Sequence, residues 1–373
     1  MRGRLLIDGR PLQDLSATRG IGTYVRSLIG ALAAVGMVDA IDLMLASGAP
    51  PPPEADGWGC GAGPRIPRLK RRLQPTADPF LVAAALARHR YCLYHAVEWA
   101  QPAVARIPVV VTVHDLIPFH FAEDYRWMRR ERLLALRLLR RADAVITPSV
   151  ATAADAIRMA GVDPARIATI PHGVDPRFRP VDRTEVAAVR ARHGIAADYV
   201  LTVGVFDPHK RLALLLDVLR LLRRTHPVEL IIPGDQGAYT ESVRQTVTAA
   251  GMAGAVRLIG HVPIEELTAL YTGARCLLFT SAYEGFGLPL LESMACGTPV
   301  VAFDNSAIPE VAGDAGLVVA DGDAAAMVHA TLPLLSDSEQ RHIRADAGLR
   351  WARSFTWERC AAATADVYLR LAG

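Results

Sequence analysis

The sequence contains no long apolar run, no secretory signal and no ordered cysteine pattern. None of its apolar stretches reaches the roughly 18 residues that a membrane-spanning helix needs. Asp8 and Arg10 interrupt the apolar start of the chain, which is therefore unlike a signal peptide. The five cysteines show no C-x-x-C spacing and no paired framework. These absences predict a cytoplasmic protein with reduced thiols.

The net charge of +3 conceals an asymmetry between the two halves of the chain. Residues 1–180 hold 24 Lys/Arg and 16 Asp/Glu, a balance of +8, whereas residues 181–373 hold 17 and 22, a balance of −5. We therefore expect two domains with different partners, and no nucleic acid among them. The positive charge of the first half favours contact with an anionic membrane surface, although an ordinary solvated face is the alternative. It concentrates in two segments, with Arg65, Arg68, Lys70, Arg71 and Arg72 in one and Arg126, Arg129, Arg130, Arg132, Arg137, Arg140 and Arg141 in the other.

Short apolar runs alternate with helical patterns along the chain. Strand-like runs occupy 4–8, 91–96, 108–113, 143–149 and 166–173, and others begin at residues 199, 228, 256, 274, 298 and 315. This alternation predicts an α/β fold with doubly wound parallel sheets. The Pro-broken segment 173–180 is typical of a linker, so we expect domains at 1–178 and 179–356. The Pro- and Gly-rich segment 47–64 is expected to be an exposed, mobile loop.

The most informative stretch is 281–299, which reads S-A-Y-E-G-F-G-L-P-L-L-E-S-M-A-C-G-T-P. Apolar runs precede and follow it, which predicts the loop and helix of a parallel βαβ unit. The helix should begin near Leu288, with Pro289 in its first turn, and should end at Gly297. The turn containing Gly285 and Gly287 would leave N–H groups unpaired at the helix N-terminus, and such a place attracts phosphate.

Two carboxylates, Glu284 and Glu292, stand at the ends of this loop and helix. Eight residues of helix span about 12 Å, whereas glycosidase carboxyl pairs lie roughly 5 to 9.5 Å apart. We therefore expect two separate contacts to one long ligand, not an acid/base couple. The alternative is that Glu284 is an ordinary loop carboxylate and Glu292 a solvated helix position.

Further candidates follow other strand-like runs or precede helices. His95 and His114 end two such runs, and ligands of parallel sheets bind beyond the carboxyl ends of the strands. A lone histidine is more often structural, and the alternative for His114 is a capping role together with Asp115. Gly20 and Gly22 open a helix, which is either an approach site for phosphate or a simple helix start.

The residues E-G-F-G-L-P-L-L-E, followed by A-C-G-T-P-V-V, resemble the E-x7-E signature of family 4 retaining glycosyltransferases. Other segments agree in order and spacing: G-I-G near Gly22, V-T-V-H-D-L-I-P, T-P-S, P-H-G-V-D, Lys210 and G-H-V-P. The resemblance implies the GT-B fold, in which two doubly wound, Rossmann-like domains face a central cleft. It also implies that the final helix, 357–373, packs back on the first domain.

By this resemblance the second domain binds a nucleoside-diphosphate sugar, with GDP-mannose favoured, and the first binds a saccharide, lipid-linked or small-molecule acceptor. Glu292 is then expected to hold the ribose and Glu284 the sugar hydroxyls, with His114 beside the transferred sugar. The implied catalytic residues are His114, Lys210 and Glu284. The implied donor-binding residues also include Gly20, Gly22, Arg211, His261, Gly285, Phe286, Gly287, Leu288 and Glu292, and the implied acceptor-binding residues are His95 and Asp115.

The chain departs from the family at one place and has no metal-binding motif. The family usually carries an arginine near its phosphate-binding lysine, but Val205 and His209 stand there, so Arg211 is the substitute beside Lys210. The D-G-D at 321–323 follows a late strand and is expected to be a turn. We therefore expect no metal and no other cofactor, with leaving-group charge stabilised by Lys210 and a helix N-terminus.

There are three alternatives to sugar transfer, of which two are other activities on this fold and one is an inactive scaffold. A nucleotide-sugar epimerase would need extra carboxylates near His114, for which only Glu98 and Glu123 are close in the sequence. A phosphorylase would need a lysine for pyridoxal phosphate, and the chain has lysine only at 70 and 210. An inactive sugar- or membrane-binding scaffold would not need to retain the candidate catalytic residues.

Overall fold

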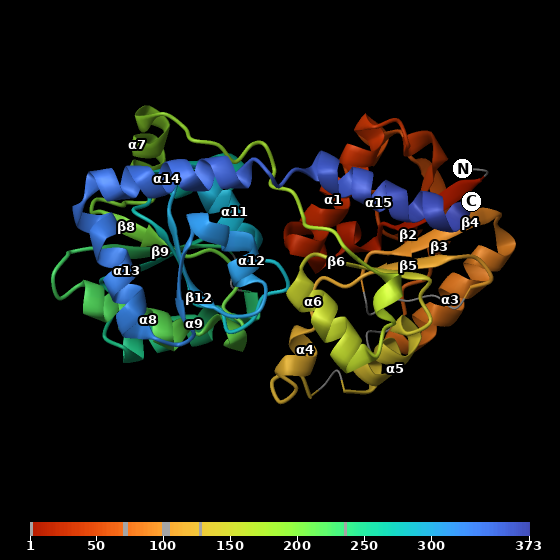
Figure 1. Cartoon of the computed structure of the whole chain (residues 1–373), viewed down its shortest axis with the longest axis horizontal. Helices are drawn as coiled ribbons and strands as arrows, with labels where there is room; N and C mark the ends of the chain where they lie inside the picture. Colours follow the sequence, from red (N-terminus) through yellow and green to blue (C-terminus); the bar gives the residue numbers. More distant parts are fainter. Residues whose placement is uncertain (1–2, 70–73, 99–104, 127–128, 235–236) are drawn as a thin grey trace. The chain divides into compact units, whose positions relative to one another are not determined.

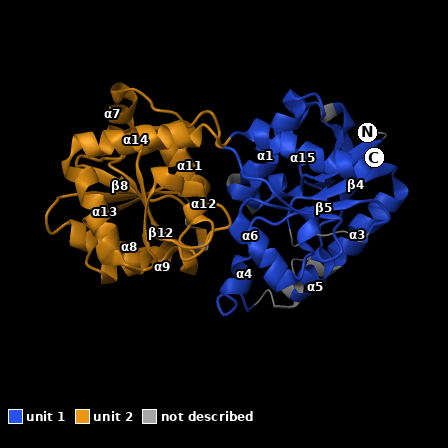
Figure 2. Cartoon of the chain, viewed as in Figure 1, with its two compact units in different colours: residues 1–173, 356–373 blue, residues 174–355 orange. Residues whose placement is uncertain are grey.

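The computed structural model describes residues 3–69, 74–98, 105–126, 129–234 and 237–373. The chain divides into two compact units, with unit 1 formed by residues 1–173 and 356–373 and unit 2 by Val174–Phe355 (Figure 2). The first boundary falls inside the Pro-broken segment, slightly before the position expected from the sequence. The final helix belongs to unit 1, although it follows unit 2 in the chain.

Unit 1 is built on a parallel sheet of seven strands in the order β3-β2-β1-β4-β5-β6-β7. The strands are β1 (Arg4–Asp8), β2 (Ile41–Ala46), β3 (Gly61–Ile66), β4 (Tyr91–Ala96), β5 (Val109–Thr112), β6 (Ala144–Thr147) and β7 (Ile167–Thr169). The helices are α1 (Gly20–Ala34), α2 (Ala55–Trp58), α3 (Gln74–Arg88), α4 (Ile117–His120), α5 (Arg129–Leu139), α6 (Val150–Asp155) and α15 (Trp357–Ala372). Helices α1 and α15 lie side by side (Figure 1).

The core of unit 1 lies on both faces of this sheet. Leu5 and Ile7 of β1 pack in one apolar cluster with Leu28 of α1 and Tyr368 of α15. Leu6, between them in sequence, belongs to the cluster on the other face. Successive side chains of a strand point to opposite faces, so a run without polar residues is what a doubly covered strand requires.

The expectation of an unstructured loop over 47–64 is wrong in part, because this segment contains α2 and the start of β3. The glycines of β3 are required by close packing. A Cβ on Gly61 would lie 1.9 Å from Oδ1 of Asp42, and one on Gly63 would lie 2.6 Å from the carbonyl oxygen of Leu43. Glycine therefore marks a close approach of two strands here, and its usual association with loops is misleading.

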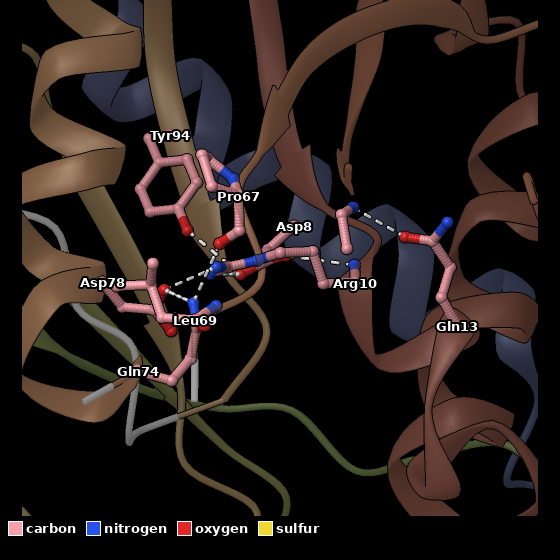
Figure 3. Close-up of polar contacts among 9 residues, drawn as sticks. Asp8, Arg10, Gln13, Pro67, Leu69, Gln74, Asp78 and Tyr94 are labelled. Carbon is pink, nitrogen blue, oxygen red and sulfur yellow. Dashed lines mark hydrogen bonds and ion pairs between the residues drawn. The ribbon is translucent and has the colours of Figure 1, made fainter. Parts of the chain in front are cut away.

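A buried polar cluster joins β1, the turn after it, α3 and β4 (Figure 3). The guanidinium of Arg10 donates to both carboxylate oxygens of Asp8, at 2.9 and 2.7 Å, and to Asp78 at 3.0 Å. The Tyr94 hydroxyl donates to Asp8 at 3.3 Å. Asp8, Arg10 and Asp78 are 1%, 7% and 3% exposed. One cation thus compensates two carboxylates that have been removed from water.

Unit 2 is built on a parallel sheet of six strands in the order β10-β9-β8-β11-β12-β13. The strands are β8 (Tyr199–Leu201), β9 (Glu229–Pro233), β10 (Val256–Gly260), β11 (Leu277–Phe279), β12 (Val300–Asp304) and β13 (Leu317–Ala320). The helices are α7 (Arg183–Arg192), α8 (Leu212–Leu222), α9 (Thr240–Ala249), α10 (Ile264–Gly273), α11 (Leu288–Ala295), α12 (Ile308–Ala312), α13 (Ala324–Ser336) and α14 (Ser338–Ala352).

The strand order of unit 2 is that of a Rossmann fold, and the first six strands of unit 1 repeat it. The predicted class of two doubly wound α/β units is therefore confirmed. In each sheet the order reverses direction between two neighbouring strands, β1 and β4 in unit 1 and β8 and β11 in unit 2. Ligands of such sheets bind beyond the carboxyl ends of the strands at this reversal.

Candidate functional site

The candidate donor site lies at the strand-order reversal of unit 2. The segments that follow β8 and β11 lie next to each other there, because these strands are neighbours in the sheet. A small pocket opens between them. It is lined by Thr202, Val203, Gly204, Val205, Phe206, Lys210, Phe279, Thr280 and Ser281. The pocket therefore brings Lys210 to the same place as the loop that leads to Glu284.

Helix α11 begins and ends as the sequence predicted. It runs from Leu288 to Ala295 with Pro289 in its first turn, Gly287 precedes it at a φ of 101°, and Gly297 follows at a φ of 73°. Both φ values lie in the left-handed region, which glycine adopts without a steric penalty. The first turn of a helix has backbone N–H groups without partners inside the helix, together with the positive end of its dipole. The glycine turn thus directs donors and positive potential beyond the helix N-terminus.

Lys210 and Glu284 form an ion pair in this site. Their side chains are 18% and 12% exposed, so the pair is largely shielded from water. Burial raises the pKa of Glu284, but the charges of Lys210 and His209 outweigh it and leave this pKa below its usual value. The ammonium nitrogen also lies 5.3 Å from the centre of the Phe279 ring. The two candidate residues therefore neutralise each other when no ligand is bound.

Arg211 is fixed beside this pair by a second carboxylate. It precedes α8 with a φ of 53°, a left-handed conformation that is costly for a residue with a side chain. Its guanidinium donates to both oxygens of Asp321, at 2.5 and 3.0 Å. Asp323 accepts a hydrogen bond from the amide of Ala326 and caps α13. The D-G-D at 321–323 is thus a turn, as predicted.

Glu292 projects from α11 and accepts a hydrogen bond of 2.8 Å from the Tyr271 hydroxyl. Burial raises the pKa of Glu292 to about 7, the Tyr271 hydrogen bond opposes this, and the charge of Asp175 adds to it. A carboxylate with such a pKa is poorly solvated, and it gains stability from a ligand that donates further hydrogen bonds. The structure rules out the alternative of a fully solvated position.

In unit 1, His114 follows β5 and both of its ring nitrogens are engaged. Nε2 lies 2.9 Å from the carbonyl oxygen of Val97, and Nδ1 lies 3.3 Å from Nε2 of His172. The Tyr24 ring packs against it in a T-shaped arrangement, with ring centres 4.6 Å apart. Burial lowers the pKa of His114 to about 4. The imidazole is therefore neutral near pH 7 and does not act as an imidazolium acid there.

The prediction of acceptor binding by His95 is wrong. His95 is fully buried, with its ring nitrogens 2.6 Å from the Tyr368 hydroxyl and 2.8 Å from the Thr112 hydroxyl. No ring nitrogen remains to reach an acceptor, so its role is structural. Asp115 accepts a hydrogen bond of 2.9 Å from the amide of Ile117 and starts a turn, which is the capping role considered from the sequence.

The remaining predicted residues are placed in different ways. A Cβ on Gly22 would lie 2.4 Å from the carbonyl oxygen of Ser16, so this glycine is needed for packing. Gly20 begins α1 with open space at its Cα, and His261 is exposed after β10. Phe286 is buried against Phe355, with ring centres 6.2 Å apart. The Phe286 side chain is therefore part of the core of unit 2.

Two family models match successive parts of the chain. The model described as "Glycosyltransferase Family 4" matches residues 18–178, and "Glycosyl transferases group 1" matches residues 188–351. The O-antigen chain mannosyltransferase B of Escherichia coli is 33% identical over 294 residues, which are 77% of this chain and 76% of that protein. The chain belongs to glycosyltransferase family 4. His114 lies in the first matched range, and Lys210, Glu284 and Glu292 lie in the second.

Solved structures share the fold of this chain. Sucrose-phosphate synthase from Thermosynechococcus elongatus superimposes with a TM-score of 0.81 at 23% identity, over 99% of both chains. HepE from Anabaena, in complex with UDP and glucose, gives 0.79 at 21% identity, over 99% of this chain and 100% of that one. Together with the two parallel sheets, these likenesses identify the fold of this glycosyltransferase as GT-B.

The ranges that the structure describes contain neither a metal-binding cluster nor a membrane-spanning helix. There, no three His, Cys, Asp or Glu side chains gather as a metal site would require. Among the helices so described, none is both long and apolar enough to cross a bilayer. Of the basic segments, Lys70, Arg71 and Arg72 lie outside the described residues, as do the side chains of Arg129, Arg130 and Arg132.

The sequence did not reveal the neighbours of the candidate residues. Tyr24 and His172, which pack against His114, come from α1 and from the segment after β7. P-H-G-V-D was recognised as a family segment, but nothing in its spacing indicated that His172 faces another histidine. Tyr271, which holds Glu292, stands in an apolar helical pattern and gave no signal of its own.

Proposed function

We propose that this family 4 enzyme is a retaining hexosyltransferase that uses a nucleoside-diphosphate sugar and needs no metal or other cofactor. Support comes above all from the Lys210–Glu284 ion pair, which lies at the strand-order reversal of unit 2. A diphosphate would take the ammonium group of Lys210, and the released carboxylate of Glu284 would accept hydrogen bonds from the sugar. Glu292 would accept hydrogen bonds from the ribose, and the first turn of α11 would lie beside the phosphates.

In the proposed reaction the bond between the sugar C1 and the leaving phosphate oxygen breaks, and a bond from C1 to the acceptor oxygen forms on the same face. The leaving phosphate oxygen takes the acceptor proton, so the products are a glycoside and a nucleoside diphosphate. The negative charge that develops on the diphosphate is stabilised by Lys210 and the α11 N-terminus. Arg211 is a second cation nearby if its bond to Asp321 is exchanged for phosphate.

The donor we propose is GDP-mannose, with a saccharide or lipid-linked molecule as acceptor. The mannosyltransferase relative from E. coli favours mannose. The purified protein should release a nucleoside diphosphate when it is incubated with GDP-mannose and an acceptor extract, with UDP-glucose and ADP-glucose run in parallel. Lys210→Met should abolish release, whereas Arg224→Met, which removes an exposed charge at the end of α8, should not. If Lys210→Met released as much nucleoside diphosphate as the unsubstituted protein, the proposed role of the Lys210–Glu284 ion pair would be refuted.

We also propose that the protein is cytoplasmic and meets the inner face of the membrane through unit 1. The excess of positive charge in residues 1–180 supports this, as do the exposed side chains of Arg65, Arg68 and Phe80, the last at 75%. Each basic residue near an anionic surface contributes about 1 kcal/mol. The protein should sediment with vesicles containing phosphatidylserine at low salt and be released by high salt. Recovery in the supernatant with both anionic and neutral vesicles at low salt would end the proposal.

A further inference from the structure

The chain passes between the two units twice, and the residues of unit 1 at these two crossings lie next to each other. The chain leaves unit 1 after Gly173 and re-enters it at Thr356. The two segments touch, because a Cβ on Gly173 would lie 2.2 Å from the amide nitrogen of Trp357 and 2.5 Å from the carbonyl carbon of Thr356. His172 and Trp357 are therefore held next to each other, immediately inside the two crossings.

These two residues belong to a packed aromatic group that includes His114. His172 stacks on Trp357, with ring centres 5.7 Å apart and planes at 21°. The Tyr24 ring centre lies 4.9 Å from that of His172 and 4.6 Å from that of His114. Tyr24, His172 and Trp357 are 0%, 4% and 5% exposed. The ring of His172 is thus fixed by its neighbours, independently of any hydrogen bond.

The hydrogen bonds of His114 determine which of its nitrogens carries the proton. A carbonyl oxygen only accepts, so the contact with Val97 places the hydrogen on Nε2. Because burial lowers the pKa of His114 to about 4, the ring is neutral and Nδ1 has a lone pair. Burial also lowers the pKa of His172. The 3.3 Å contact is then a hydrogen bond that His172 Nε2–H donates to Nδ1 of His114.

We propose that His172 is a positioning residue that, by donating to Nδ1 of His114, holds the ring plane of His114 at the carboxyl end of β5. The proposal rests on the function proposed above and on the expectation, from the family resemblance, that His114 lies beside the transferred sugar. The only ring N–H of His114 then points along the direction of the Val97 carbonyl, and a sugar hydroxyl replaces that carbonyl as its acceptor. The bond from His172 persists throughout, as the second partner of a working histidine commonly does.

Three substitutions separate this role from simple packing. His172→Phe keeps a ring against Trp357 but removes the donor, whereas His172→Gln can place an amide N–H near the position of Nε2. His342→Gln removes an exposed histidine of unit 2 and is the matched control. Thermal melting monitored by circular dichroism establishes that each variant is folded.

The first measurement uses the protein without substrate. With ¹⁵N-labelled histidine, the His114 signals are assigned by their loss in His114→Gln. In the unsubstituted protein and in His172→Gln, Nδ1 should show the downfield shift of an unprotonated nitrogen and Nε2 that of a protonated one. In His172→Phe the Nδ1 signal should move further downfield, because its lone pair no longer accepts a hydrogen bond, while Nε2 stays protonated against the Val97 carbonyl. Unchanged shifts in a folded His172→Phe would overturn the proposal.

The second measurement is kinetic. His172→Phe should lower kcat roughly tenfold, the size expected for one lost hydrogen bond, while KM for the donor changes little. His172→Gln should retain kcat within about threefold of the original enzyme. Equal kcat for the Phe variant and the original enzyme would overturn the proposal. If the original protein turned over no nucleotide sugar, the proposed function would fail, and the NMR result would still decide whether His172 donates to Nδ1 of His114.

Discussion

Glu292 offers a direct test of the donor site, because its stability effect and its binding effect have opposite signs. The substitution is Glu292→Gln, which preserves the size of the side chain and an oxygen that accepts from Tyr271, but removes the charge. The pKa of Glu292 is about 7 in the folded protein, mainly because of burial, against an ordinary value of 4.5. The folded state therefore keeps a proton that the unfolded state loses between these two values.

The sign of the stability effect follows from this proton. Stability falls as pH rises through the window from about 4.5 to 7, because the native state binds more protons than the unfolded state there. The cost of ionising the buried carboxyl is under about 1 kcal/mol at pH 5 and reaches about 3 kcal/mol at pH 8. Glu292→Gln removes this cost, so the variant should be the more stable protein at pH 8 and nearly equal to the original at pH 5.

Donor binding should change in the opposite direction. If the ionised carboxylate accepts hydrogen bonds from the ribose, its loss should weaken GDP binding by about 1.5–3 kcal/mol. This corresponds to a Kd for GDP that is roughly 10- to 150-fold higher. The original protein should bind less tightly as pH falls below 7, because the carboxyl must first lose its proton. In the Glu292→Gln variant this contribution to the pH dependence should disappear.

Both effects are measurable with one set of proteins. Thermal unfolding at pH 5 and pH 8 gives the stability difference, since 1 kcal/mol shifts the melting temperature of a unit of this size by about 2–4 °C. Calorimetric titration with GDP gives the binding difference. Glu265→Gln, an exposed glutamate on α10 of the same unit, is the matched control and should show neither effect. An unchanged Kd for GDP in Glu292→Gln would remove this residue from the donor site.

Two further predictions concern the charge of the two units. Arg10→Met should destabilise unit 1 by about 3–5 kcal/mol, because Asp8 and Asp78 would remain buried without their cation. It is measured by thermal unfolding against the exposed control Arg224→Met, and a loss below about 1 kcal/mol would contradict the assignment of a compensated cluster. Sugar transfer should persist in EDTA, because in the proposed site Lys210 and the α11 N-terminus would take the place of a divalent cation. Activity that vanished in EDTA and returned with Mg²⁺ or Mn²⁺ would show that these groups are insufficient.

The sequence was sufficient where structure is determined by neighbouring residues. The bounds of α11 followed from Pro289 and Gly297, whose backbone preferences act locally. The N-cap of α6 is also a local feature, since the hydroxyl of Ser149 accepts a hydrogen bond of 3.0 Å from the amide of Thr152. The alternation of apolar and helical segments gave the class of fold for the same reason.

The contacts that determine the chemistry of the site were not predictable in this way. Lys210 and Glu284 are 74 positions apart, and His114 and His172 are 58 apart. Each pair meets only because the strands before its members lie close together in one sheet. The glycines of β3 led to an error of another kind, because they were interpreted as belonging to a loop. The close approach of a neighbouring strand is what requires glycine at these positions. Local patterns could not distinguish these two reasons for glycine.

The placement of α15 has a consequence for the order in which the protein can be made. Unit 2 is one continuous segment, and all of its residues are synthesised before α15. Unit 1 must wait for the last part of the chain, since α15 supplies Trp357, Ala361 and Tyr368 to its core and the hydroxyl partner of His95. The half that is translated first is therefore the half that is completed last. A chain that ends at residue 355 and has been released from the ribosome should hold a finished unit 2 and an open unit 1, which is the reverse of the usual N-terminal-first order.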